Sequence, residues 1–115
     1  MKVAIIGSRD FNNYELLAKT LDDFTIDMIV SGGAKGADTL AERYALLHDI
    51  EILIFKPDYK LYSRGAPLKR NFQIVDASDI VLAFWDGKSR GTKHAIDYAL
   101  SQNKQVFNPL STNKL

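Results

Sequence analysis

The chain has 115 residues, 46% of them hydrophobic and 25% charged, so one domain can bury about two thirds of its unfolded surface without disulfides or metals. Fifteen basic and fourteen acidic residues leave a net charge of +1, which provides no overall field to attract DNA or a membrane. The absence of cysteine excludes a disulfide scaffold, a thiol nucleophile and thiolate metal ligands.

Strands are predicted wherever β-branched and apolar residues follow one another without polar alternation, the pattern of a sheet covered on both faces. The first apolar run is too short for a signal peptide, and the longest, at residues 80–85, is far too short to span a bilayer. A cytoplasmic protein without a membrane partner is therefore expected. Five runs fit a strand: residues 3–6, 28–30, 52–55, 80–85 and 105–107.

Four stretches between these strands have the 3.6-residue apolar spacing of helices. The first is capped by Asn12 or Asn13, the second begins at Ala37, the third begins with Pro67, and the fourth follows a loop at residues 86–90. Their predicted buried positions include Leu16, Leu17, Leu21 and Phe24; Ala37, Leu40, Ala41, Tyr44, Ala45 and Leu47; Leu68, Phe72 and Val75; and Ala95, Ile96, Ala99 and Leu100.

The alternation of strands and helices predicts an α/β protein with a three-layer Rossmann-like fold. We expect a mainly parallel five-stranded sheet in the order 3-2-1-4-5, with residues 1–108 as the domain and residues 109–115 as a C-terminal tail. In that order strands 2, 1 and 4 are neighbours, so the loops after them meet at one edge of the sheet.

Those three loops carry the residue types that bind phosphate. Glycine lets backbone N–H groups turn toward an anion, and a helix that starts behind the loop adds unpaired donors. The loop after strand 2 is neither a Walker A motif nor the dinucleotide fingerprint, and a tight strand–helix turn is the alternative interpretation. The predicted loop residues are Gly7, Ser8 and Arg9; Ser31, Gly32, Gly33, Lys35 and Gly36; and Asp86, Gly87, Ser89, Arg90, Gly91 and Thr92.

Further candidates come from charge and aromaticity. Arg9, Arg70 and Asn71 could contact a phosphate, although each could equally be an ordinary surface residue. Asp38 and Glu42 lie one helical turn apart and, with Arg70, are the candidate catalytic residues; capping or solvation is their alternative role. Thr92 could merely cap its helix. His94 is expected to face solvent.

These pieces resemble the SLOG superfamily, specifically its small YspA-type, cpYpsA-related branch. The resemblance rests on residues 7–11 (GSRDF), 30–38 (VSGGAKGAD), 70–71 (RN) and 83–92 (AFWDGKSRGT). It implies a Rossmann-like fold that binds nucleotide-derived ligands, and it relates the chain to the LOG phosphoribohydrolases, which release a base from a nucleoside monophosphate, and to the DprA proteins, which bind single-stranded DNA. LOG-like relatives usually form dimers, so a homodimer through the helix at Pro67 is expected.

One departure from the LOG pattern bears on function. Gly91 and Thr92 align with the Gly-Thr of the LOG motif Pro-Gly-Gly-x-Gly-Thr-x-x-Glu, but Ala95 stands where the catalytic glutamate would be.

We therefore expect binding or sensing of a nucleotide or ADP-ribose-like ligand, with no required cofactor. Asp38 and Asp86 would contact ribose and an aromatic from the Tyr59–Tyr62 loop would cover the base. A metal site is not predicted, because His48 and His94 lack ligand spacing. Two alternatives remain: hydrolysis with a non-standard carboxylate, and DNA binding through Lys35, Lys88, Arg90 and Lys93, which the neutral net charge disfavours.

Overall fold

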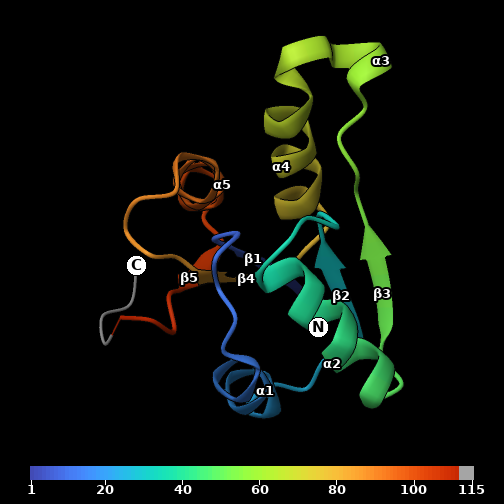
Figure 1. Ribbon diagram of the computed structural model, residues 1–115, viewed down its shortest axis with the longest axis vertical. Coiled ribbons are helices and arrows are strands. Elements are labelled where there is room, and N and C mark those ends of the chain that lie inside the picture. The colour runs from blue at the N-terminus through green and yellow to red at the C-terminus, as the bar shows by residue number, and fades with distance from the viewer. Residues whose placement is uncertain (112–115) are drawn as a thin grey trace.

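The computed structural model describes residues 1–111 and contains one five-stranded parallel sheet (Figure 1). Its strand order, β3-β2-β1-β4-β5, is the predicted one. The strands are β1 (Lys2–Gly7), β2 (Met28–Ser31), β3 (Glu51–Ile54), β4 (Ile80–Phe84) and β5 (Gln105–Phe107). The parallel register sets Ala4 beside both Val30 and Val81, so the strand ends that carry the three loops lie together.

Helices cover both faces of the sheet, which confirms the three-layer α/β architecture. α1 (Tyr14–Asp22) and α2 (Ala37–Leu47) pack on one face, whereas α4 (Ala66–Asp76) and α5 (Arg90–Ser101) pack on the other. A short helix, α3 (Tyr59–Tyr62), and a 3₁₀ turn, η1 (Ser63–Gly65), lead into α4. In residues 1–111, none of the helices combines the length and the apolar character needed to cross a bilayer.

The central strand shows why its sequence lacks polar alternation. Val3 and Ile5 point into the cluster under α1 and α2, while Ala4 and Ile6 point into the cluster under α4 and α5. Successive side chains of a strand alternate between faces, and here both faces are buried. A continuous apolar run is therefore what this position in the sheet requires.

The helix boundaries agree with the sequence-based predictions better than the predicted buried positions do. Asn13 caps α1, because its side-chain oxygen accepts a hydrogen bond from the backbone N–H of Leu16 at 3.0 Å. Three predicted core leucines are instead exposed: Leu47 by 63%, Leu68 by 44% and Leu100 by 43%. Leu47 and Leu100 lie near helix ends, where the neighbouring alanine takes the buried position, and Leu68 lies at the open edge of the sheet, where it lines the cleft described below.

Candidate functional site

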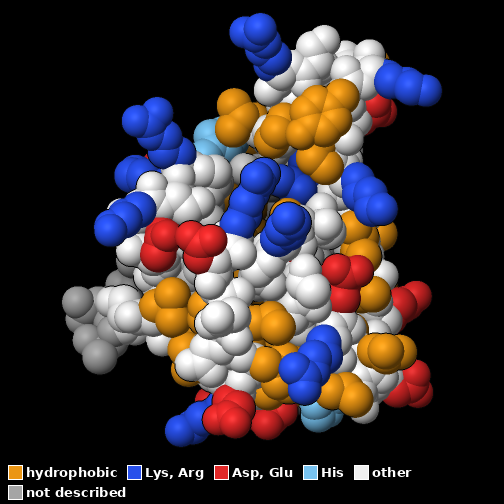
Figure 2. Space-filling model, in the orientation of Figure 1, with side chains coloured by type: hydrophobic (Ala, Val, Ile, Leu, Met, Phe, Trp, Pro, Cys, Tyr) orange, Lys and Arg blue, Asp and Glu red, His pale blue; other side chains and the backbone are white. Residues whose placement is uncertain are grey.

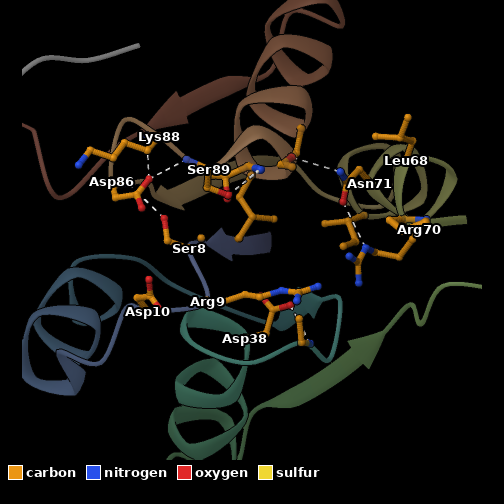
Figure 3. Close-up of a pocket in the computed structure, with 18 residues that line it drawn as sticks. Ser8, Arg9, Asp10, Asp38, Leu68, Arg70, Asn71, Asp86, Lys88 and Ser89 are labelled. Carbon is orange, nitrogen blue, oxygen red and sulfur yellow. Dashed lines mark hydrogen bonds between the residues drawn. The ribbon is translucent and has the colours of Figure 1, made fainter. Parts of the chain in front are cut away.

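A cleft of about 630 Å³ opens at the carboxyl ends of β1 and β4 (Figure 3). Strand order reverses between these two strands, and such switch points are where open α/β sheets bind ligands. Figure 2 shows Lys and Arg side chains at the hollow in this face. The cleft is lined by Ile6, Gly7, Ser8, Arg9, Asp10, Ala34, Asp38, Pro67, Leu68, Arg70, Asn71, Ile74, Asp86, Lys88, Ser89, Gly91, Thr92 and Ala95.

The loop after β1 is anchored on both sides of Arg9. The backbone N–H of Ser8 donates to the carbonyl of Phe84 at 3.1 Å, and Phe11 packs its ring 4.8 Å from that of Phe84. Arg9 between them is exposed and lines the cleft. A fixed backbone thus presents a guanidinium group to the space where a ligand would lie.

The glycine loop after β2 is closed by an internal carboxylate. Asp38 is 7% exposed, and its Oδ2 accepts a hydrogen bond from the backbone N–H of Ala34 at 3.0 Å. Among residues 31–36, Ala34 alone lines the cleft. One of the backbone N–H groups in the loop that was expected to hold a phosphate, that of Ala34, therefore already has a partner.

The glycines of this loop serve close packing in the structure. A Cβ on Gly32 would collide with the Arg70 guanidinium, and one on Gly36 would collide with the backbone oxygens of Ser8 and Arg9. Gly36 also has φ +79°, which L-residues rarely adopt. At Gly36 the close approach to the backbone of the loop after β1 requires glycine, whereas at Gly32 the Arg70 side chain would have to move.

Arg70 and Asn71, at the cleft side of α4, form a linked pair. Arg70 donates from Nη1 to the carbonyl of Gly32 at 2.9 Å and from Nε to Oδ1 of Asn71 at 3.2 Å. The amide nitrogen of Asn71 lies 3.3 Å from the carbonyl of Gly91 and 3.4 Å from Nδ1 of His94. Asn71 therefore connects the arginine to the first turn of α5.

The loop after β4 also contains an internal anion. Oδ1 of Asp86 accepts hydrogen bonds from the backbone N–H groups of Lys88 and Ser89, both at 2.8 Å, and the N–H of Asp86 donates to Oγ of Ser8 at 3.2 Å (Figure 3). Ser89 is the N-cap of α5. The indole of Trp85 donates to the Ser89 carbonyl at 2.9 Å, which fixes the start of that helix.

Within residues 1–111, unpaired backbone N–H groups at the cleft come from Arg9 and Asp10 and from the start of α5. Within residues 1–111 the N–H groups of Arg90 and Gly91 have no hydrogen-bond acceptor, as is usual for the first turn of a helix. The N–H of Thr92 lies 3.5 Å from Oγ of Ser89, a long contact. Thr92 is buried, its hydroxyl is 3.1 Å from that of Ser89, and it lines the cleft. Thr92 thus joins the capping group without being the N-cap itself.

Electrostatics differ between the two aspartates. Burial raises the pKa of Asp38, against the opposing effects of the Ala34 amide and the positive charge of Arg70. The backbone amides of Ser89 and Lys88 lower the pKa of Asp86. Burial also lowers the pKa of Arg70, and the Asp38 carboxylate partly reverses that shift. Arginine nevertheless stays protonated in proteins, so the cleft keeps its positive groups.

Several predicted site residues lie outside the cleft lining. They are Ser31, Gly32, Gly33, Lys35, Gly36, Glu42, Gly87 and Arg90, and the aromatics Tyr59 and Tyr62. His94 is half-buried beside Asn71 and the ring of Phe72, so the expectation that it faces solvent was wrong. Sequence reasoning did not select Asp10, Pro67, Leu68 or Ile74 as site residues, although Asp10 directly follows the predicted Gly-Ser-Arg turn.

No group of three or more His, Asp or Glu side chains within residues 1–111 is arranged to hold a metal ion. The cleft instead combines three acidic side chains, Asp10, Asp38 and Asp86, with three basic ones, Arg9, Arg70 and Lys88. Its fold and cleft define a Rossmann-like domain with a polar site at the switch point of the sheet.

Comparison with known proteins identifies the family. Residues 1–62 match the model of the YspA, cpYpsA-related SLOG family. The Gene 61 protein of Mycobacterium phage D29 is 30% identical over 118 residues, which cover 93% of this chain and 94% of that protein. The chain belongs to the YspA, cpYpsA-related SLOG family.

Solved structures with the same fold include two DNA processing proteins. DprA from Streptococcus pneumoniae has a TM-score of 0.79 at 20% identity over 93% of this chain, which spans about half (49%) of that protein. DprA from Helicobacter pylori, whose structure concerns single-stranded DNA binding, has a TM-score of 0.74 at 27% identity over 99% of this chain and 67% of its own. The structural-genomics target TM1055 has a TM-score of 0.69 at 19% identity, covering 91% of this chain and 71% of its own. The likeness to DprA weighs against the expectation that nucleic acid is an unlikely partner.

Proposed function

We propose that the cleft binds a nucleotide or nucleotide-derived ligand through its phosphate. The observation that carries this proposal is the convergence of Arg9, Arg70 and the first amides of α5 on one cleft. Guanidinium groups and unpaired helix amides are the donors that phosphate oxygens accept best.

Small and apolar groups leave room for the rest of such a ligand. Gly7, Ala34 and Ala95 line the cleft with little side-chain volume, and Pro67 and Leu68 offer an apolar wall for a base. Tyr59 and Tyr62 lie outside the cleft lining, so we assign the contact with the base to Leu68 instead of to an aromatic of the Tyr59–Tyr62 loop. Ala95 presents a methyl group where the LOG motif carries its glutamate, which favours binding over bond cleavage as the proposal.

The test is calorimetric titration of the folded protein with a panel of nucleotides, ADP-ribose and inorganic phosphate. The R9A variant should weaken binding of any ligand found by about tenfold or more, because a hydrogen bond to a charged group contributes about 1.5–3 kcal/mol. Arg9 is exposed and makes no hydrogen bond within residues 1–111, so the variant should fold normally.

The matched control is K19A, which removes one positive charge from an exposed position on α1 outside the cleft. It should bind the ligand as the wild type does. Silence of the wild type across the whole panel, or equal losses in R9A and K19A, would contradict phosphate binding in this cleft. Trp85 is the one tryptophan in the sequence, and its bond to Ser89 makes its fluorescence a second readout.

Single-stranded DNA is a second candidate ligand, favoured by a concentration of charge. Residues 56–70 contain five of the fifteen basic residues and one of the fourteen acidic ones, so the neutral net charge conceals a basic segment. Its side chains form what we call the basic aromatic surface, which comprises Lys56, Tyr59, Lys60, Leu61, Tyr62, Arg64, Leu68 and Lys69, all exposed. Figure 2 shows hydrophobic and basic side chains together over α3 and the start of α4.

Exposed aromatics beside lysines suit stacked bases and a phosphate backbone. A homodimer through the helix at Pro67 stays a prediction, and the like charges that the neighbouring basic aromatic surface would bring together at a two-fold axis would oppose it. Fluorescence anisotropy with a labelled oligothymidine tests the DNA alternative. Binding that weakens with salt and with the double variant Y62A/K69A would support it, whereas no binding at low salt would remove it.

A further inference from the structure

In each of the two glycine-bearing loops at the cleft, a carboxylate accepts hydrogen bonds from backbone amides that could otherwise bind an anion. In the loop after β2, Asp38 takes the amide of Ala34, and in the loop after β4, Asp86 takes the amides of Lys88 and Ser89. Within residues 1–111, the unpaired donors left at the cleft are the N–H groups of Arg9 and Asp10, those at the start of α5, the Arg9 guanidinium and the part of the Arg70 guanidinium that Gly32 and Asn71 do not bind.

We infer that Asp38 is a specificity-determining residue that restricts the cleft to ligands with a single phosphate group. This inference rests on the proposed function. A first phosphate at Arg9, Arg70 and the start of α5 meets positive charge and unpaired donors, whereas a second phosphate linked to it adds negative charge to a cleft that already contains the carboxylates of Asp38 and Asp86. Both aspartates thus act as internal anions that exclude a diphosphate.

The position of Asp38 suits this role better than a contact with ribose. Its side chain is almost fully buried yet lines the cleft, and one of its oxygens is held by the loop amide (Figure 3). Arg70 closes the same loop by donating to the carbonyl of Gly32. The loop is therefore complete without a ligand, and its shape does not depend on one.

Charge count leads to the same result. The three basic and three acidic side chains of the cleft sum to zero net charge, so the cleft holds no excess positive charge to match a second phosphate. A further negative charge placed beside Asp38 is repelled, because like charges a few ångströms apart at a partly buried site interact strongly. Discrimination between ligands by such a repulsive element is a common source of specificity.

The test compares AMP with ADP, and inorganic phosphate with pyrophosphate, in the wild type and in the D38N variant. Asparagine has the same shape as aspartate, and its Oδ1 can still accept the hydrogen bond from Ala34, so the loop should keep its conformation. The wild type should bind the monophosphate of each pair about tenfold more tightly than the diphosphate. In D38N the affinity for the diphosphate should rise about tenfold, with less than about a threefold change for the monophosphate.

E15Q is the matched control. Glu15 is exposed in the first turn of α1, lies outside the cleft, and makes no side-chain hydrogen bond within residues 1–111. The substitution removes one negative charge without touching the cleft, so the ratio of the two affinities should stay at the wild-type value.

A second measurement needs no variant. Protonation of Asp38, whose pKa burial raises against the effects of Arg70 and the loop amides, removes its charge as the pH falls. Glu42, which faces Asp38 from the same helix, also raises this pKa. AMP and ADP each carry one terminal phosphate that titrates similarly, so the ratio of their affinities isolates the protein's contribution. The ratio should shift toward ADP as the pH falls through the folded pKa of Asp38.

The outcomes separate the two proposals. Equal or tighter binding of the diphosphates by the wild type, or an unchanged ratio in D38N, would overturn the role of Asp38 while leaving the nucleotide site intact. No binding of any phosphate compound by the folded wild type would overturn both.

Discussion

Substitution of Gly36 by alanine tests whether the glycine loop is shaped by packing rather than by a ligand. Gly36 has φ +79° and ψ −126°, close to a region that only glycine occupies freely, which costs another residue about 1–3 kcal/mol. An added Cβ would also lie 2.7 Å from the carbonyl oxygen of Arg9 and closer still to that of Ser8. Both neighbours are backbone atoms and cannot swing aside, so overpacking adds about 1–3 kcal/mol.

We therefore expect G36A to lower the free energy of unfolding by roughly 3–4 kcal/mol, out of about 5–15 kcal/mol for a domain of this kind. For a chain of this size each kcal/mol shifts the melting temperature by about 4 °C, so the melting temperature should fall by roughly 12–16 °C. Urea unfolding followed by Trp85 fluorescence, with thermal unfolding by circular dichroism, measures both quantities.

Two other glycines provide controls. Gly87 has φ +82° but open space around its Cβ position, so G87A should cost only the backbone strain of about 1–2 kcal/mol. Gly91 lies in the first turn of α5 with open space and no positive φ, so G91A should be neutral or stabilise by up to about 1 kcal/mol. If G36A costs no more than G87A, the contact between this loop and β1 is not rigid and the reasoning fails.

Three further predictions concern pH and individual hydrogen bonds. The pKa of Asp86 is lowered in the folded state, so its contribution to stability is present above the unfolded pKa of about 3.8 and is lost as the pH falls through the folded pKa. The free energy of urea unfolding between pH 5 and 2.5 should therefore depend less on pH in D86N than in the wild type. An identical dependence on pH in the two proteins would contradict this. Tyr44 is 4% exposed and donates to Oδ1 of Asp22 at 2.7 Å, so Y44F should lower the free energy of urea unfolding by about 1 kcal/mol. Burial raises the pKa of the Tyr44 phenol, so an alkaline absorbance titration of Y44F should lack the tyrosine that ionises late in the wild type. W85F removes the indole bond to Ser89 and should lower stability by about 1 kcal/mol while weakening phosphate binding at the start of α5; unchanged binding would show that the helix start does not need this support.

Much of the architecture was predictable because strands that are buried on both faces of a parallel sheet have continuous apolar runs in the sequence. The run at β4, for example, has no polar residue to interrupt it, and all five of its residues are buried. Signals at helix starts, such as Asn13 before α1, were equally readable. The convergence of three loops on one cleft followed from the strand order, which alternation and handedness together indicated.

The chemistry within the loops was less predictable, because hydrogen-bond partners depend on distances that sequence does not contain. Glycines in the β2 loop suggested a phosphate cradle, yet two of them make room for Arg70 and for the backbone of Ser8. Asp38 suggested a contact with a ligand, yet its carboxylate holds the loop's own amide. The basic segment at residues 56–70 was visible in the sequence, but the net charge of the whole chain concealed it.

The sequence by itself determined the class of fold, since a parallel sheet covered on both faces follows from periodicity and from the alternation of strands and helices. The strand order, and with it the edge where the loops meet, was an inference that the tertiary structure confirmed. Only the tertiary structure decided which donors at that edge are already paired. Pairing depends on which side chains from β1, α2, α4 and α5 reach the same amides, and residues as far apart as Gly32 and Arg70 meet there only after folding.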